Sequence, residues 1–271
     1  AGCDPLRCVV DGRSFADLAG ASRAELAEFY DQRGVPGSLG FPRKQRVLEE
    51  ARRFGSTLGP DDVFVLYFAG QGTRARDGGG YGDGDEQLCF VEEDGSANFL
   101  QRDELAAVLL NDFQPSTRVL LITESRCAGS LCDLSACEFD GRPVCHMSAV
   151  QDRESAGADD IAERATFTVS LLRSIQLLVC EGSEECSLVD VFNACFAASA
   201  RWWQELRFEC ARGLDPDTFA WPLVPPWSWV VPHHVLDGGG AMPAGKALPL
   251  PFAAARPATA AAAASEPEPS P

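Results

Sequence analysis

Continuous apolar runs in the middle of the chain predict the strands of a buried sheet. "VFVLYFAG", beginning at Val63, and "TRVLLIT", residues 117–123, are runs of the kind found in strands that are covered on both faces. "LCFV", "RPVCHMSAV" and "LRFECA" predict further strands later in the chain. The apolar runs alternate with helical patterns. The predicted fold class is therefore an α/β sandwich with a mostly parallel sheet.

Apolar residues spaced three and four apart predict the helices. The clearest begins at Pro42 with "PRKQRVLEEARRFG", and Gly55 together with Gly59 and Pro60 is expected to end it. "QRDELAAVLLNDF", "ATFTVSLLRSIQLLV" and "SLVDVFNACFAASARWW" predict three more, the last capped by Ser187. "AELAEFYDQRG" near the start also has helical spacing and ends at a glycine.

Composition divides the chain into a folded part and a tail. Residues 1–232 are predicted to form one domain. Residues 233–271 are rich in Gly, Pro and Ala and are expected to be a disordered tail. The chain begins at Ala1 rather than Met, so the alternative of a truncated N-terminal part stays open.

The net charge and the positions of the cysteines limit the classes of partner and the cellular compartment that we expect for this protein. The net charge of −17 argues against nucleic acid, since phosphate binding needs a basic surface. No run approaches the ~18 apolar residues of a membrane span, so no membrane partner is expected. Several of the eleven cysteines lie inside apolar runs, where thiols behave as small hydrophobic groups. This pattern favours a reducing compartment and predicts a cytoplasmic protein.

Two predicted strands end in unusual sequence. After "VFVLYF" comes "AGQG", which places Gln71 between two glycines. After "VLLIT" comes "ESRCAGS", which contains Arg126 and Cys127. In an open α/β sheet, ligands and reactive groups lie at the carboxyl edge of the strands. The two strands are expected to be parallel neighbours, with Gln71 and Arg126 at that edge.

These segments, in this order, resemble the caspase-fold cysteine peptidases, and the metacaspase branch most closely. That family has a strand ending in Ser-Gly-His-Gly, an acidic Asp-Glu-x-Leu loop, and a strand ending in Asp-x-Cys-x-Ser-Gly. The chain offers "DDVFVLYFAGQG", "DGDEQLCFVEEDG" and "TRVLLITESRCAGS" at similar spacing, followed by "RPVCHMSAVQDRESA". The resemblance runs from about Pro42 to Pro225 and implies a caspase-like three-layer α/β/α sandwich.

The departures from the family pattern fall on its catalytic positions. Gln71 stands where the resemblance puts the histidine base, and an amide does not accept a proton at neutral pH. Arg126 stands where it puts the cysteine nucleophile, and a guanidinium is no nucleophile. The catalytic dyad is therefore expected to be absent. The three histidines lie elsewhere, with His146 expected to be a packed residue of a strand.

An alternative interpretation keeps the catalytic activity of a cysteine peptidase. Cys127 becomes the nucleophile after a slip of one residue, and Arg126 beside it would lower its pKa. The base would then come from elsewhere, for example from a partner chain. A slip of one residue, however, turns the side chain to the other face of the strand end.

The resemblance also implies two binding features. Glu124 stands for the family's Asp and is a candidate substrate-binding residue for a basic side chain, and Arg126 is a candidate ion-pair partner for it. Many metacaspases use calcium, and Asp83, Asp85 and Glu86 would supply the carboxylates of a weak site. The simpler interpretation of these acids is a solvated loop, with no cofactor.

The predicted function is that of a metacaspase-like homologue without catalysis, which binds or regulates a protein or peptide. One possible partner is an active caspase-like relative. Two alternatives stay open: an active cysteine endopeptidase that uses Cys127 or a base supplied by a partner, and a structural scaffold module.

Overall fold

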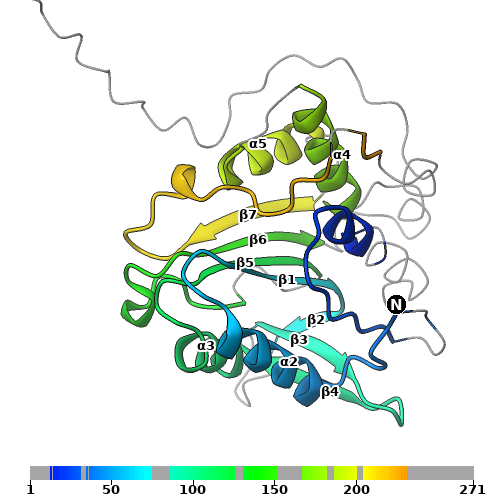
Figure 1. Cartoon of the computed structure of the whole chain (residues 1–271). Helices are drawn as coiled ribbons and strands as arrows, with labels where there is room; N and C mark the ends of the chain where they lie inside the picture. Colours follow the sequence, from blue (N-terminus) through cyan, green and yellow to red (C-terminus); the bar gives the residue numbers. More distant parts are fainter. Residues whose placement is uncertain are drawn as a thin grey trace, which may run out of the picture.

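The computed structural model places a twisted four-stranded sheet between two layers of helices (Figure 1). It describes residues 13, 15–31, 35, 37–74, 86–125, 131–151, 167–181, 186–199, 204–226 and 228–230. Within these ranges no helix combines the length and the apolar character needed to cross a membrane. The predicted tail, residues 233–271, lies outside the described residues.

The main sheet has the strand order β1-β5-β6-β7, and it is mostly parallel as predicted. Its strands are β1 (Val63–Gly70), β5 (Arg118–Ser125), β6 (Val144–Gln151) and β7 (Gln204–Cys210). β1 and β6 both run parallel to β5, whereas β7 is antiparallel to β6.

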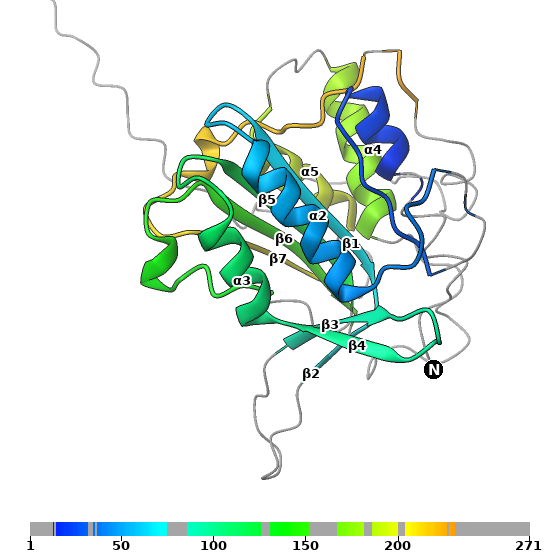
Figure 2. The ribbon, with the colours of Figure 1, turned by 60° about the horizontal axis from the view of Figure 1, so that its bottom comes forward.

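Helices cover both faces of this sheet, which gives three layers (Figures 1 and 2). One layer contains α2 (Lys44–Thr57) and α3 (Arg102–Asn111), and the other α4 (Phe167–Cys180) and α5 (Leu188–Ser199). β5 serves both faces, because successive side chains of a strand point in opposite directions. Two apolar cores result, one on each side of the sheet.

β1 is less buried than its sequence predicts. Its apolar run forms a strand, but only Phe64 is buried and the other residues are half-buried. β5 has seven buried residues out of eight. The reason is position. Among the described strands β1 is one of the two edges of the main sheet, so one of its sides lacks a neighbouring strand.

A second, smaller sheet lies beyond the carboxyl end of β1 (Figure 2). It is antiparallel and has the order β2-β3-β4, with β2 (Gly72–Arg74), β3 (Glu86–Val91) and β4 (Ala97–Gln101). The backbone N–H of Cys89 in β3 donates to the carbonyl of Gln71 at 2.9 Å. This bond ties the end of β1 to the small sheet.

α2 runs past the glycine that was expected to end it. Gly55 lies inside the helix, and Thr57 is its last residue. A Cβ at Gly55 would stand 2.7 Å from the carbonyl oxygen of Asp112 and 2.7 Å from the Phe113 ring. The glycine is thus needed for close packing of α2 against the end of α3, and it does not act as a stop signal.

The start of α5 is capped as predicted. The Ser187 hydroxyl accepts the backbone N–H of Asp190 at 3.1 Å, and the Asp190 carboxylate accepts the N–H of Ser187 at 2.9 Å. A later segment of the chain closes over this turn: the carbonyl of Phe219 accepts the N–H of Leu188, and the carbonyl of Cys186 accepts that of Trp221. Trp221 is buried in the core on the α4 and α5 side.

The N-terminal helix prediction is wrong in its position. Residues 24–30, expected to be helical, have no regular structure, and the described helical residues before them are 13 and 15–21. Arg23 has a φ of 61°, which breaks the helix direction, and Leu18 packs into the core beside α4. The following segment passes β1 from the α4 layer to the α2 layer (Figure 2).

Candidate functional site

Gln71 lies at the carboxyl edge of the sheet, immediately after β1. Gly70 is paired in register with Ser125, the last residue of β5, so position 71 and position 126 follow neighbouring strand ends. The predicted parallel pairing of these two strands is confirmed. Arg126 and Cys127 themselves lie outside the described residues.

Glu124 is the best-defined polar group at this edge. It is buried, with 5% of its surface exposed. Its carboxylate accepts the first two backbone N–H groups of α4, those of Phe167 at 3.1 Å and Thr168 at 3.0 Å. The N-terminus of a helix carries partial positive charge and unpaired donors, so a carboxylate is stabilised there. Glu124 therefore fixes α4 to β5.

A hydroxyl chain extends this contact to β1. The Thr168 hydroxyl donates to Glu124 at 2.5 Å, and Tyr67 Oη lies 2.7 Å from Thr168 Oγ1. A hydroxyl has one hydrogen to donate, and Thr168 gives it to the carboxylate. Tyr67 is then the donor to Thr168. The chain from Tyr67 through Thr168 to Glu124 joins β1, α4 and β5 beside the predicted site.

The assignment of Glu124 as a substrate-binding residue stays a prediction. Its carboxylate oxygens face the start of α4, which already supplies three donors. The predicted ion pair with Arg126 involves a residue outside the described part of the chain. What the geometry establishes is a positioning role for Glu124 at this strand end.

His146 is a packed histidine of the sheet, as its place in the sequence predicts. It is 1% exposed, and Nε2 lies 2.8 Å from Thr123 Oγ1. Burial lowers its pKa to about 4, so the ring is neutral near pH 7. It stands opposite Leu121, four residues before the end of β5, which is about 13 Å along the strand. His146 is therefore remote from Gln71.

The buried thiols of the described residues have the character of apolar packing groups, whereas Cys137 and Cys180 are exposed. Burial raises the pKa of Cys132 and of Cys195 to about 12, and it also raises the pKa of Cys145. Cys89, next to Gln71 across the backbone bond, also has its pKa raised by burial. A thiol with a raised pKa holds little thiolate and is a poor nucleophile.

Two of the three residues of the predicted calcium site, Asp83 and Asp85, lie outside the described residues. Glu86 is described. It is buried at the start of β3, with Oε1 3.6 Å from Nη2 of Arg74 in β2. Within the described ranges no three His, Cys, Asp or Glu side chains gather closely enough to hold a metal ion. The calcium site stays a prediction.

Known proteins resemble this chain weakly in sequence and more broadly in fold. No family model matches it. The protein named Inactive metacaspase-4 of Trypanosoma brucei brucei is 27% identical over 145 residues, which is 50% of this chain and 40% of that protein. The chain thus spans less than half the length of this relative. The weak homology suggests a caspase-like, metacaspase-type family.

The fold likeness covers more of the chain. A crystal structure of a protein from Geobacter sulfurreducens matches 79% of this chain and 88% of its own, with a TM-score of 0.51 and 20% identity. At this identity the likeness concerns the fold alone. It agrees with the mixed α/β architecture and its mostly parallel central sheet.

Sequence reasoning missed Tyr67 and Thr168. Thr168 lies 44 positions after Glu124 and 101 after Tyr67. Neither residue belongs to a motif that signals such a contact. The signal that was available is the carboxylate itself, because an acid at the end of a buried strand needs donors, and a helix start is the common source.

Proposed function

We propose that this chain is a catalytically inert, caspase-like module of metacaspase type that acts by binding a protein or peptide. The observation that carries the proposal is the position of Gln71. It directly follows Gly70, which is paired in register with Ser125, the last residue of β5. By the resemblance, this is the position of the histidine base.

An amide at that position removes general base catalysis. A cysteine peptidase needs a base within hydrogen-bond reach of its thiol, at about 2.6–3.2 Å. Gln71 cannot take the proton, and His146 pairs with β5 about 13 Å before the end of that strand and has its pKa lowered by burial. Arg126 at the nucleophile position removes the second member of the pair.

The comparison with the trypanosome protein supports the same proposal. Its name describes a metacaspase that is inactive. An inert homologue can still act by occupying a partner's surface, for instance that of an active caspase-like relative. The competing proposal is an active endopeptidase that uses Cys127, and it requires cleavage that depends on that thiol.

The test is a cleavage assay with peptides that carry Arg or Lys at the scissile position, with and without calcium. The wild-type protein is expected to leave them intact. The double substitution Gln71→His with Arg126→Cys is expected to produce more cleavage than either single change, because base and nucleophile act as a unit. Wild-type cleavage that disappears in Cys127→Ala would overturn the proposal and establish the endopeptidase.

A further inference from the structure

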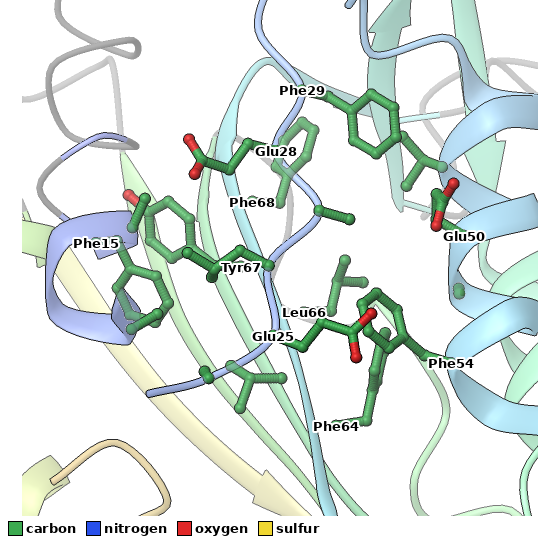
Figure 3. Close-up of a pocket in the computed structure, with 18 of the residues that line it drawn as sticks. Phe15, Glu25, Glu28, Phe29, Glu50, Phe54, Phe64, Leu66, Tyr67 and Phe68 are labelled. Atoms are coloured by element: carbon green, nitrogen blue, oxygen red, sulfur yellow. The ribbon is translucent and has the colours of Figure 1, made fainter. Parts of the chain in front are cut away.

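The two outer strands of the described main sheet differ in what lies beside them. β1 borders a cavity of about 1020 Å³, whose lining includes Phe64, Tyr67 and, from an earlier segment, Phe15 (Figure 3). β7, at the other side of the sheet, places a thiol opposite a thiol of its neighbour, because Cys210 is the register partner of Cys145 in β6. Two facing cysteines can be joined only where the backbone spacing and the side-chain directions allow it.

The backbone bonds between β6 and β7 place these thiols at the closer of the two kinds of antiparallel position. At the preceding pair of facing residues, the N–H of Ala211 donates to the carbonyl of Val144 at 2.9 Å. Hydrogen-bonded and non-hydrogen-bonded pairs alternate along such a ladder, so Cys145 and Cys210 form a non-hydrogen-bonded pair. The Cα atoms of such a pair are about 4.5 Å apart, at the lower limit of the roughly 4.4–6.8 Å that a disulfide spans.

Both thiols lie on the α4 and α5 side of the sheet. Cys145 is fully buried in the core on that side, and Cys210, which is half-buried, packs against the same core. The thiols are close enough to affect one another, since the pKa of Cys145 is raised by burial and also by Cys210. Facing side chains of an antiparallel pair have Cβ atoms about 4.5–5.5 Å apart, so a small shift brings them to the roughly 3.5–4.5 Å of a disulfide.

The two thiols differ in their access to solvent. Cys145 has no exposed surface, whereas Cys210 is half-buried and its thiol points to the carbonyl of Leu214, with Sγ 3.9 Å from the oxygen. A reagent in solution therefore reaches Cys210 first. Burial raises the pKa of both thiols, so little thiolate is present near pH 7 and the first reaction is slow. The second reaction, between two sulfurs held side by side, is favoured by their proximity.

We propose that Cys145 and Cys210 are a redox-sensitive site, which a low-molecular-weight disulfide such as oxidised glutathione converts into a reversible cross-strand disulfide. The Cys210 thiolate attacks one sulfur of the reagent, which forms a mixed disulfide and releases one thiol. The Cys145 thiolate then attacks the Cys210 sulfur, and the second thiol leaves. The two protein thiols are oxidised, the reagent is reduced to two thiols, and the two protons pass from the protein thiols to the released thiols.

The disulfide fixes β7, and the helix that packs on it, to the rest of the sheet. The ring of Phe208, two residues before Cys210, lies 5.2 Å from the ring of Phe192 in α5. The linked cysteines are 65 positions apart, from 145 to 210, and closing a loop of that size restricts the unfolded chain. Because the Cα spacing is at the lower limit, the link is strained and is reduced more readily than a relaxed disulfide.

This inference goes beyond the proposed function and does not depend on it. The partner of Cys145 in β5 is Leu120, five residues before the end of that strand. Five strand residues span about 16 Å, so the thiol pair is remote from the strand ends that position Gln71. The disulfide therefore changes the stability of the domain and leaves the predicted catalytic positions untouched.

The experiment incubates the whole reduced chain with mixtures of reduced and oxidised glutathione, alkylates the remaining thiols, and digests the protein with trypsin and a protease that cleaves before Asp. Cys145 then lies in peptide 140–151 and Cys210 in peptide 208–212, and each peptide contains one cysteine. Mass spectrometry is expected to detect these two peptides joined, two hydrogens lighter than their sum. The joined species is expected to increase with the share of oxidised glutathione and to disappear in an excess of reduced glutathione.

Matched variants test which thiols form the link. Cys210→Ser and Cys145→Ala each remove one thiol and are expected to abolish the joined peptides. Cys180→Ser changes an exposed thiol at the end of α4 and is expected to leave their amount unchanged. The midpoint of urea unfolding is expected to shift to a higher urea concentration when the wild type is oxidised, and to stay unchanged when Cys210→Ser is treated in the same way.

Three results would overturn the proposal. The first is absence of the joined peptides at every glutathione ratio in samples where the exposed Cys180 is modified, since the reagent was then active. The second is a link from Cys210 to a cysteine other than Cys145. The third is an equal urea midpoint for oxidised and reduced wild type. The cleavage assay is carried out on reduced protein, so failure of this proposal and failure of catalytic inertness are distinguishable.

Discussion

β1 and β5 read almost alike in sequence and differ in the structure. Both are eight-residue strands with apolar runs, and they are direct neighbours. β5 has a strand on each side and a helical layer on each face, whereas β1 has a strand on one side and a cavity on the other. The comparison teaches that an apolar run specifies coverage of the two faces of a strand, and says little about its two edges.

The largest expected effect is a difference in stability when the same substitution, Leu to Ala, is made in each of the two strands. Leu121→Ala in β5 removes a fully buried side chain and is expected to lower the free energy of unfolding by about 3–4 kcal/mol. Leu66→Ala in β1 removes a half-buried side chain and is expected to cost about half as much. Urea denaturation of both variants gives the comparison. Equal costs would mean that the β1 edge is as covered as the centre of the sheet.

A pH effect is expected from the covered interior. In the unfolded chain His146 binds a proton near its ordinary pKa of 6.5, but in the folded protein burial lowers this pKa to about 4. Between these values the unfolded state binds more protons, so stability falls as the pH falls, by up to about 3 kcal/mol. Above pH 6.5 His146 is mostly neutral in both states, so it adds little pH dependence to the free energy of unfolding.

Urea denaturation between pH 7 and about pH 4.5 tests this prediction in the wild type and in His146→Gln. The substitution keeps a polar group that can bond to Thr123, its partner at 2.8 Å. The variant is expected to lose less stability over this range. Parallel curves for the two proteins would show that His146 is protonated in the folded state as readily as in the unfolded one.

The smallest expected effects concern the polar contact that joins the two strands through α4. Glu124→Gln replaces a carboxylate that accepts two N–H groups and a hydroxyl, and it is expected to cost about 2 kcal/mol. Tyr67→Phe removes one hydroxyl donor and is expected to cost about 1 kcal/mol. Glu49→Gln, on the exposed face of α2, is the control and is expected to stay within about 0.5 kcal/mol.

The double variant sharpens this last comparison. Tyr67 and Glu124 both bond to the hydroxyl of Thr168. The double substitution is therefore expected to lower the free energy of unfolding by less than the sum of the two single substitutions. Strictly additive costs in chemical denaturation would show that the two contacts are independent and that no chain connects β1 to β5.

The sequence was sufficient for features that depend on local pattern. The strands from Val63 and Arg118, the helix at Lys44 and the Ser187 cap all follow from residue spacing and short-range hydrogen bonding. It was insufficient at residues 24–30, whose helical spacing is overridden by the turn at Arg23 and by packing beside β1. Local propensity yields to tertiary contacts there.

The site divides in the same way. Gln71 was placed at the carboxyl edge from its position after an apolar run, because strand ends are set by the chain itself. The bonds from α4 to Glu124 depend on how a distant helix docks, and the cavity beside β1 depends on which strands are neighbours. Neither is encoded in a short segment. The catalytic, calcium and substrate assignments stay predictions.

The Phe219–Trp221 segment has a consequence for the order in which the protein can assemble during synthesis. The core beneath α2 and α3 uses residues from Leu48 to Val144, with Ala211 as a late addition. The core beneath α4 and α5 needs Phe15 from one end of the described chain and Leu223 from the other. The first face can therefore form on a growing chain, while the second stays open until the segment that bonds the start of α5 has been made.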